Sequence, residues 1–303
     1  MNIEYKSIAD MRLAILHNLH KFPHDIDLVV GIPRSGMLPA NLIALYLNKP
    51  FTDIDSFVEG RIYSSGERTK FTGEYKSGKV LIVDDSIAKG VALGKAKDKL
   101  ANNPSLSNLT LIWAVVYASG EGADKVDVYC EKTGLYRIFE WNIFHHPYFI
   151  PHCCCDIDGV LCPNPPIDDD GSLYTEYIAN APILFKPTRK IDTLVSCRLE
   201  KYRSITEGWL KSNGIEYGKL IMLDFKNKEE RIAWGKHGEY KGEYYKKSDN
   251  VLFIESSLGE AKDILRVSGK PVFCTENYEM INDNSIKYKL KQKIHFFLEN
   301  FRK

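Results

Sequence analysis

Hydrophobic residues in the first half of the chain follow two different spacings. From residue 8 to residue 19 the apolar side chains recur at the spacing of one helix face. Residues 28–32, 80–83 and 109–116 are instead unbroken apolar runs that are rich in branched side chains. Such short runs are typical of strands that are buried on both faces of a parallel sheet. The pattern therefore predicts alternating helices and strands, in an open α/β sheet.

The same alternation starts again after an aromatic segment at residues 136–149. Pro147 and Pro151 punctuate the end of that segment, and a new strand is predicted to begin at His152. Further strands are predicted at about residues 193–195, 220–223, 251–254 and 271–274, with helical stretches such as residues 199–212 between them. We therefore expect two α/β domains with open, mainly parallel sheets, at residues 1–150 and 151–303.

Length and composition agree with two folded domains and exclude several partners. The 303 residues are about twice the usual domain size. The 41 lysines and arginines nearly balance the 40 acidic residues, which leaves no net field to hold a nucleic acid. No apolar run reaches the roughly 20 residues that cross a bilayer, and the N-terminus lacks the pattern of a signal peptide. We expect a cytoplasmic protein without an integral membrane segment, and self-association into a homo-oligomer is left open.

Three consecutive cysteines, Cys153, Cys154 and Cys155, precede an aspartate. Adjacent residues of a strand point to opposite faces, which is unfavourable for a shared zinc ion. The odd total of seven cysteines also makes a poor disulfide framework. We interpret the three as small buried strand residues in a reducing compartment.

A pair of acids follows the apolar run at residues 80–83. Asp84 and Asp85 lead into a turn of small residues and then into a predicted helix. Backbone N–H groups in such a turn can surround a phosphate, and paired carboxylates can accept hydrogen bonds from vicinal hydroxyls. A sugar phosphate is the ligand that needs both features.

These residues resemble the signature of type I phosphoribosyltransferases, which bind phosphoribosyl pyrophosphate (PRPP). The resemblance implies that Asp84 and Asp85 hold the ribose hydroxyls. It assigns the 5-phosphate to the loop that follows, which comprises Ser86, Ile87, Ala88, Lys89, Gly90, Val91 and Ala92. The family usually has hydroxyl residues where Lys89 and Ala92 stand, so a PRPP-sensing domain without transferase activity remains an alternative.

A second match lies upstream, after the run at residues 28–32. Arg34, Ser35 and Gly36 resemble the pyrophosphate loop of the same family. Glycine permits a close approach of the backbone, and arginine donates forked hydrogen bonds to phosphate oxygens. The basic, glycine-containing segment at residues 60–78 is similar to the loop that family members close over the substrate.

Two further acids, Asp156 and Asp158, end the strand that begins at His152. They are two positions apart and therefore point to one side of the strand. They resemble motif I of haloacid dehalogenase-like (HAD) phosphatases, which implies that Asp156 is the nucleophile and Asp158 the general acid and base. The later motifs match in order, with Ser196 for the phosphoryl group, Lys241 for charge neutralisation and Glu255 in the metal site.

The HAD resemblance implies Mg²⁺ as the cofactor, with Asp156, Asp158 and Glu255 as its ligands. The superfamily usually has an aspartate where Glu255 stands, and other lysines at residues 236–247 could replace Lys241. Only about 30 residues separate the first two motifs. We therefore expect a HAD-like Rossmannoid domain with a small cap.

The fusion of the two resemblances indicates a two-step function. Transfer from PRPP leaves a 5-phosphate on the product, and a phosphatase in the same chain can remove it. We expect a bifunctional enzyme that attaches 5-phosphoribose to an acceptor, with a glycan in polysaccharide biosynthesis as the first choice, and then leaves a plain ribofuranosyl unit. A nucleobase-modifying enzyme, with a planar pocket from aromatic residues such as Trp141, and a PRPP sensor that regulates a phosphatase are the alternatives.

Overall fold

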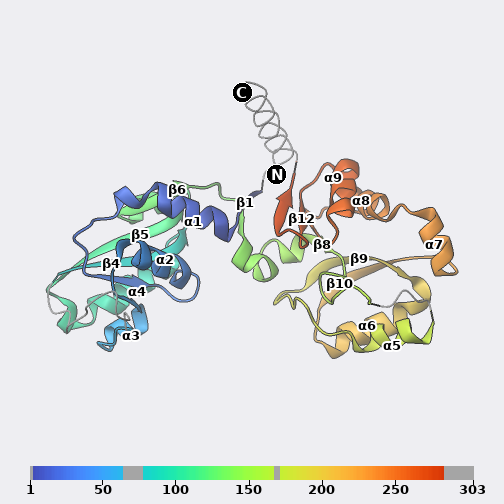
Figure 1. Ribbon diagram of the computed structural model, residues 1–303, viewed down its shortest axis with the longest axis horizontal. Helices are drawn as coiled ribbons and strands as arrows, with labels where there is room; N and C mark the ends of the chain where they lie inside the picture. The colour runs from blue at the N-terminus through green and yellow to red at the C-terminus, as the bar shows by residue number, and fades with distance from the viewer. Residues whose placement is uncertain (1–2, 64–77, 167–170, 283–303) are drawn as a thin grey trace, which may run out of the picture. The chain divides into compact units, whose positions relative to one another are not determined.

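The computed structural model describes residues 3–63, 78–166 and 171–282, and the chain divides into two compact units (Figure 1). The N-terminal unit comprises Glu4–Trp141, and the C-terminal unit begins at Asn142. The junction lies inside a short 3-10 helix, Glu140–His145, within the aromatic segment that the sequence places before its boundary near residue 150. Among the described residues, no helix is long and apolar enough to cross a membrane.

The N-terminal unit is built on a five-stranded parallel sheet in the order β3-β2-β4-β5-β6. Its strands are β2 (Leu28–Gly31), β3 (Phe51–Asp53), β4 (Gly78–Ile87), β5 (Leu109–Ala118) and β6 (Val128–Lys132). Its helices are α1 (Ile8–His17), α2 (Met37–Leu47), α3 (Ile54–Val58) and α4 (Val91–Ala101). A two-stranded parallel sheet pairs β1 (Glu4–Lys6) with β7 (Arg137–Phe139).

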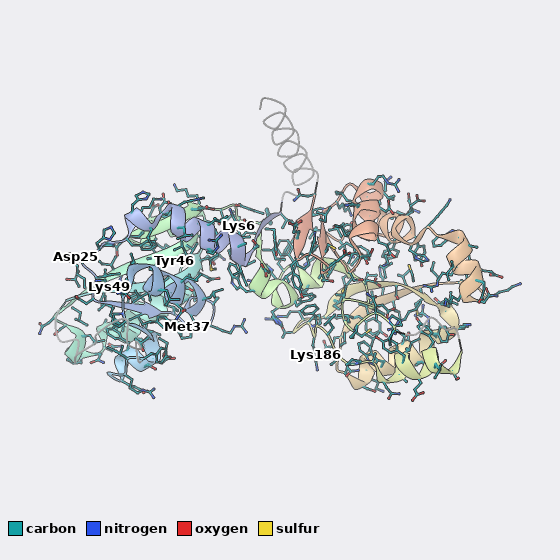
Figure 2. The ribbon with its side chains drawn as sticks, in the orientation of Figure 1. Lys6, Asp25, Met37, Tyr46, Lys49 and Lys186 are labelled. Atoms are coloured by element: carbon teal, nitrogen blue, oxygen red, sulfur yellow. The ribbon has the colours of Figure 1, made fainter. Side chains whose placement is uncertain are left out.

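Both faces of this sheet are covered, which explains the unbroken apolar runs. Leu81 and Val83 of β4 belong to the core cluster under α1 and α2, while Val80 and Ile82 belong to the cluster under α3 and α4. Figure 2 shows the side chains of these layers, with Tyr46 of α2 labelled. The continuous run in β4 is therefore the sequence of a strand with two buried faces.

Two boundaries differ from those predicted for this unit. Helix α1 ends at His17 rather than near residue 19, because Asn18 forms the C-cap and a 3-10 turn follows. Strand β4 continues through both acids to Ile87, because it remains paired with β5 as far as Ile87 and Ala118. Asp84 and Asp85 therefore lie within the last part of a strand and not in the loop after it.

The C-terminal unit contains a six-stranded sheet in the order β10-β9-β8-β11-β12-β13, in which only β13 is antiparallel among the described strands. Its strands are β8 (Cys153–Cys155), β9 (Ile191–Leu199), β10 (Tyr217–Leu223), β11 (Leu252–Glu255), β12 (Val272–Cys274) and β13 (Glu279–Ile281). Its helices are α5 (Ser172–Asn180), α6 (Arg203–Ser212), α7 (Lys228–Trp234), α8 (His237–Lys247) and α9 (Leu258–Ser268). The two sheets confirm the predicted α/β class with mainly parallel strands.

Strand β8 lies between β9 and β11, and its three residues are the consecutive cysteines. All three side chains are buried, and none forms a disulfide. Burial raises the pKa of the Cys154 thiol to about 12. The cysteines are therefore small core residues, as their position in the sequence indicates.

Candidate functional site

The acids of β4 meet the loop after β2 at the carboxyl ends of two adjacent parallel strands. The N–H of Ile32 donates to the carbonyl of Val83 at 2.9 Å, which brings the following loop against Asp84. Gly36 lies so close that a Cβ there would be 2.8 Å from the Cα of Asp84. The structure thus brings together Ser35, Gly36, Asp84 and Asp85, and it shows why glycine is required in this loop.

Asp85 is held by two side chains from distant parts of the chain. The hydroxyl of Ser35 donates to its Oδ1 at 3.0 Å, and the indole N–H of Trp141 donates to its Oδ2 at 2.8 Å. Asp84 has a different environment, because its Oδ1 accepts the backbone N–H of Asp85 at 2.8 Å. Burial, together with the charge of Asp85, raises the pKa of Asp84 from 3.8 to about 8.

We expect Asp84→Asn to stabilise the protein at about pH 8 more than at about pH 5. Asp84 has a higher pKa in the folded than in the unfolded state, so wild-type stability falls as the pH rises from about 4 to about 8. Asparagine does not ionise, and its advantage should grow by at least about 1 kcal/mol across this window. Thermal unfolding of both proteins at the two pH values measures the difference. The same change at exposed Asp98 is the control, and a pH-independent advantage for Asp84→Asn would contradict the assignment.

Only three of the seven residues predicted to form the 5-phosphate loop lie in a loop. Ser86 and Ile87 belong to β4, and Val91 and Ala92 form the first turn of α4. The connection is made by Ala88, Lys89 and Gly90, where Gly90 has a φ of 79° and caps the helix. Lys89 is exposed, and its carbonyl accepts a hydrogen bond from Lys125.

For two of the predicted substrate-binding elements, Arg34 and the basic loop, the described residues show no hydrogen bond or ion pair with the acids of β4. Arg34 is exposed, next to a cis peptide bond between Pro33 and Arg34. Most of the basic loop predicted at residues 60–78 lies outside the described residues.

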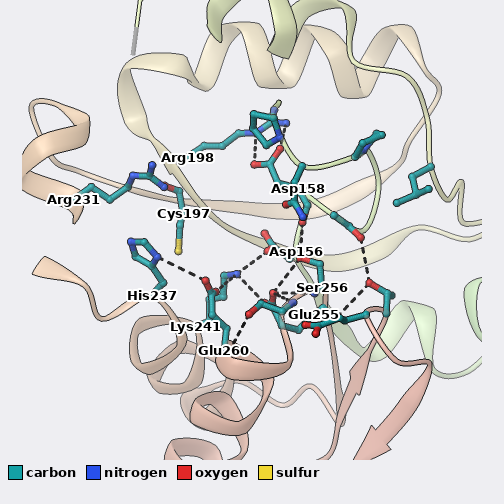
Figure 3. A pocket seen from close by; sticks show the side chains of 18 of the residues that line it. Asp156, Asp158, Cys197, Arg198, Arg231, His237, Lys241, Glu255, Ser256 and Glu260 are labelled. Atoms are coloured by element: carbon teal, nitrogen blue, oxygen red, sulfur yellow. Dashed lines mark hydrogen bonds and ion pairs between the residues drawn. The ribbon is translucent and has the colours of Figure 1, made fainter. Parts of the chain in front are cut away.

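A second site lies at the carboxyl ends of β8 and β11 in the C-terminal unit (Figure 3). Asp156 follows β8 and Glu255 ends β11, and the N–H of Asp156 donates to the carbonyl of Ile254 at 2.9 Å. Lys241 reaches from α8 and places its Nζ 2.7 Å from Asp156 Oδ2, Glu255 Oε2 and Glu260 Oε2. Its side chain is buried, whereas the other lysines at residues 236–247 are exposed.

Asp158 faces the same cavity but has a different partner. Its carboxylate accepts two hydrogen bonds from Arg198, from Nε at 2.9 Å and from Nη2 at 2.7 Å. The Arg198 side chain is completely buried, and Figure 3 shows this pair apart from the Lys241 cluster. Arg198 and Glu260 are not among the residues predicted from the sequence. The signals that could have found them are an arginine two positions after Ser196 and an acid in the first turn of α9, the helix that follows Glu255.

Ser196 does not line this cavity, although its neighbours Cys197 and Arg198 do. It is completely buried in β9, where its Oγ accepts the backbone N–H of Arg198 at 3.2 Å. The pairing of β9 with β10 is irregular in this region, between Val195 and Leu199. Cys197 and Arg198 thus line the cavity at this irregularity, while the Ser196 hydroxyl bonds within its own strand.

The cavity has a volume of about 720 Å³, far more than the phosphoryl group alone requires. Its walls include Pro163, Pro165, Pro166 and Tyr174 from the segment between β8 and β9, together with Tyr202, Lys228, Arg231 and His237. Residues 167–170 of this segment lie outside the described residues. The cavity therefore has room for an organic leaving group between aromatic and basic side chains.

One ammonium group faces three carboxylates in this site. Burial acts to lower the pKa of Lys241, but the charges of Asp156 and Glu255 raise it well above its ordinary value. Burial raises the pKa of Asp156, and Lys241 acts in the opposite direction. His237 and Lys241 lower the pKa of Glu260 to about 2, although burial opposes them. The lysine therefore keeps its positive charge at physiological pH.

The predicted magnesium ligands line one cavity, but their carboxylates have different partners. The carboxylate of Asp158 is paired with Arg198, while those of Asp156 and Glu255 are paired with Lys241. Within residues 3–63, 78–166 and 171–282, no three His, Cys, Asp or Glu side chains are grouped to hold a metal ion. The three-acid set therefore does not fit Mg²⁺ in this arrangement, and no step of the chemistry is assigned to the ion.

Comparisons with known proteins concern the N-terminal unit. Residues 4–150 match the family model of the phosphoribosyl transferase domain. Purine phosphoribosyltransferase from Pyrococcus horikoshii Ot3 is 20% identical, with a TM-score of 0.34, over 46% of this chain and 94% of that one. Xanthine-guanine-hypoxanthine phosphoribosyltransferase from Helicobacter pylori is 13% identical, with a TM-score of 0.35, over 47% and 93% of the two chains. Among curated proteins, none matches this chain.

Proposed function

We propose that the chain, whose residues 4–150 match the family model of the phosphoribosyl transferase domain, transfers 5-phosphoribose from PRPP to an acceptor and then removes the 5-phosphate in its C-terminal unit. The observation that carries the second step is Lys241, with its Nζ 2.7 Å from Asp156 and Glu255 at the floor of a large cavity. A buried carboxylate beside a fixed cation suits nucleophilic attack on a phosphoester. The product of the transfer is such an ester.

In the proposed transfer, an acceptor oxygen or nitrogen forms a bond to C1 of the ribose while the bond from C1 to pyrophosphate breaks. Pyrophosphate departs with the bonding electron pair, and the proton of the acceptor is released to solvent. Asp84 and Asp85 hold the ribose hydroxyls, and the loop at Ser35 and Gly36 holds the pyrophosphate. The backbone at Gly90, where α4 begins, faces the 5-phosphate.

In the proposed hydrolysis, a carboxylate oxygen of Asp156 forms a bond to phosphorus while the bond from phosphorus to the ribose oxygen breaks, and the departing ribose oxygen takes a proton from solvent. Lys241 offsets the charge that accumulates on the phosphoryl group. Water then attacks phosphorus and restores Asp156. Asp158, which Arg198 holds as a hydrogen-bond acceptor, is placed to take the proton of that water.

The acceptor that we propose is a hydroxyl group of a carbohydrate. Removal of the 5-phosphate is useful when the final product carries plain ribofuranose, whereas a nucleotide is defined by that phosphate. A nucleobase is the second candidate, because the half-buried ring of Trp141 lies beside Asp85 and offers a flat surface. Both acceptors use the same PRPP site.

Pyrophosphate release tests this function. We expect the wild-type protein with PRPP to release pyrophosphate when an oligosaccharide pool is added, and mass spectrometry should detect a pentosyl product without phosphate. Asp85→Asn should weaken PRPP binding by about 10- to 100-fold, the usual cost of a lost hydrogen bond to a charged group. Release of pyrophosphate with nucleobases, and not with oligosaccharides, would identify a nucleobase as the acceptor. PRPP binding without release for any acceptor would indicate a sensor instead.

A further inference from the structure

The carboxylate of Asp85 is fixed before any substrate arrives. Its two oxygens accept hydrogen bonds from Ser35 Oγ and Trp141 Nε1, at 3.0 Å and 2.8 Å. These donors are far apart in the sequence, since Trp141 is the last residue of the N-terminal unit. A carboxylate offers about four lone-pair positions, so about two remain for a ribose hydroxyl.

Trp141 is itself held in place by a column of aromatic rings. Its ring is stacked on Phe139 at 4.7 Å between centroids and 4° between planes. Phe139 is stacked in turn on Tyr117 at 5.5 Å, and both of these rings are buried in the core. The column therefore anchors the indole to β5 and β7, and it aims the N–H at Asp85 rather than letting the ring rotate away.

We propose that Trp141 is a positioning residue for PRPP binding, which holds the Asp85 carboxylate so that its free lone pairs face a ribose hydroxyl. The indole N–H can only donate a hydrogen bond, so its partner must be an oxygen of Asp85 that accepts one. The Oδ1 of Asp84 accepts the backbone N–H of Asp85, and its side chain lies beside that of Asp85. The two acids therefore have different hydrogen-bond partners, and Trp141 and Ser35 belong to Asp85. This inference rests on the proposed role of Asp85.

Trp141→Phe separates the hydrogen bond from the packing, because phenylalanine retains a ring over Phe139 but has no N–H. Calorimetric titration with PRPP should be carried out on the wild type, on Trp141→Phe, on Asp85→Asn and on the double variant. We expect Trp141→Phe to weaken PRPP binding about tenfold in the wild-type background. In the Asp85→Asn background the same change should have an effect of less than about twofold, because the two residues act through one bond.

Two controls distinguish positioning from a general loss of structure. Binding of inorganic pyrophosphate should be unchanged in Trp141→Phe, since that ligand has no ribose. Trp113→Phe makes the same chemical change in β5, at a side chain that is 9% exposed, and should leave PRPP binding unchanged. An equal loss in both Asp85 backgrounds, or no loss at all, would overturn the role of Trp141.

Intrinsic fluorescence gives a second measurement that does not depend on the folding of Trp141→Phe. PRPP should shift the emission of a protein that keeps only Trp141 of the four tryptophans, and should leave the emission of that protein with Asp85→Asn unchanged. A missing shift in the first protein would overturn the inference. If Asp85→Asn alone binds PRPP normally, the proposed role of Asp85 fails together with the inference; if Asp85→Asn binds weakly and Trp141→Phe binds normally, only the inference fails.

Discussion

Asp156→Asn is expected to lower the rate of phosphate release by about a thousandfold or more, while transfer from PRPP continues. An amide nitrogen does not form the phosphoryl intermediate, so the first chemical step is lost. Asparagine has nearly the same volume as aspartate, and Lys241 keeps Glu255 and Glu260 as partners. Phosphate release from the purified, phosphoribosylated product measures the effect, and that product should accumulate in the reaction of the variant.

Asp224→Asn is the matched control, because Asp224 is exposed in the same unit. It should hydrolyse the phosphorylated product at the rate of the wild type. Rapid phosphate release by a folded Asp156→Asn protein would show that Asp156 is not the nucleophile. It would leave the transferase assignment intact, because that assignment depends on the N-terminal unit.

Lys241→Met is expected to reduce the free energy of unfolding of the C-terminal unit by about 3–5 kcal/mol. The methionine side chain replaces the apolar stem, so the change removes mainly the ammonium group. Asp156 and Glu255 would then remain as neighbouring buried acids without their common cation. Urea unfolding, analysed for a separate transition of each unit, measures the effect.

The cost of Lys241→Met should depend on pH in a defined direction. Without the ammonium group the buried acids have higher pKa values in the folded than in the unfolded state, so the variant loses stability as the pH rises. The difference in free energy of unfolding between the wild type and Lys241→Met should therefore become smaller toward low pH. Lys247→Met, an exposed position in the same helix, should change stability by less than about 0.5 kcal/mol. A similarly small effect for Lys241→Met would contradict the buried ion-pair cluster.

Local patterns in the sequence are sufficient to predict the two sheets and the positions of the acids. The apolar runs identify strands such as β4 and β5 because both faces of each strand are buried. Asp84, Asp156 and Glu255 are recognisable because they follow such runs at the carboxyl ends of parallel strands. The three-residue strands β1, β3 and β7 are too short to show a periodicity, and the structure adds them.

The partners of the acids could not be read from the sequence for a different reason. Trp141 lies 56 residues from Asp85, and Arg198 lies 40 residues from Asp158. Such contacts depend on the order of the strands and on an irregularity in β9, which no local pattern encodes. The same holds for Glu260, which approaches Lys241 only because α8 and α9 pack together. The sequence thus indicates the reactive groups, and the fold determines which charges surround them.

The cysteines of β8 have a consequence for following the protein in solution. Their side chains are at most 1% exposed, and β8 is enclosed by a strand on each side. Since burial also raises the pKa of the Cys154 thiol to about 12, almost no reactive thiolate exists while the sheet is intact. Alkylation of these thiols therefore requires separation of the central strand from its neighbours. The rate of their modification therefore reports the opening of the C-terminal sheet at the strand that immediately precedes Asp156, the proposed nucleophile.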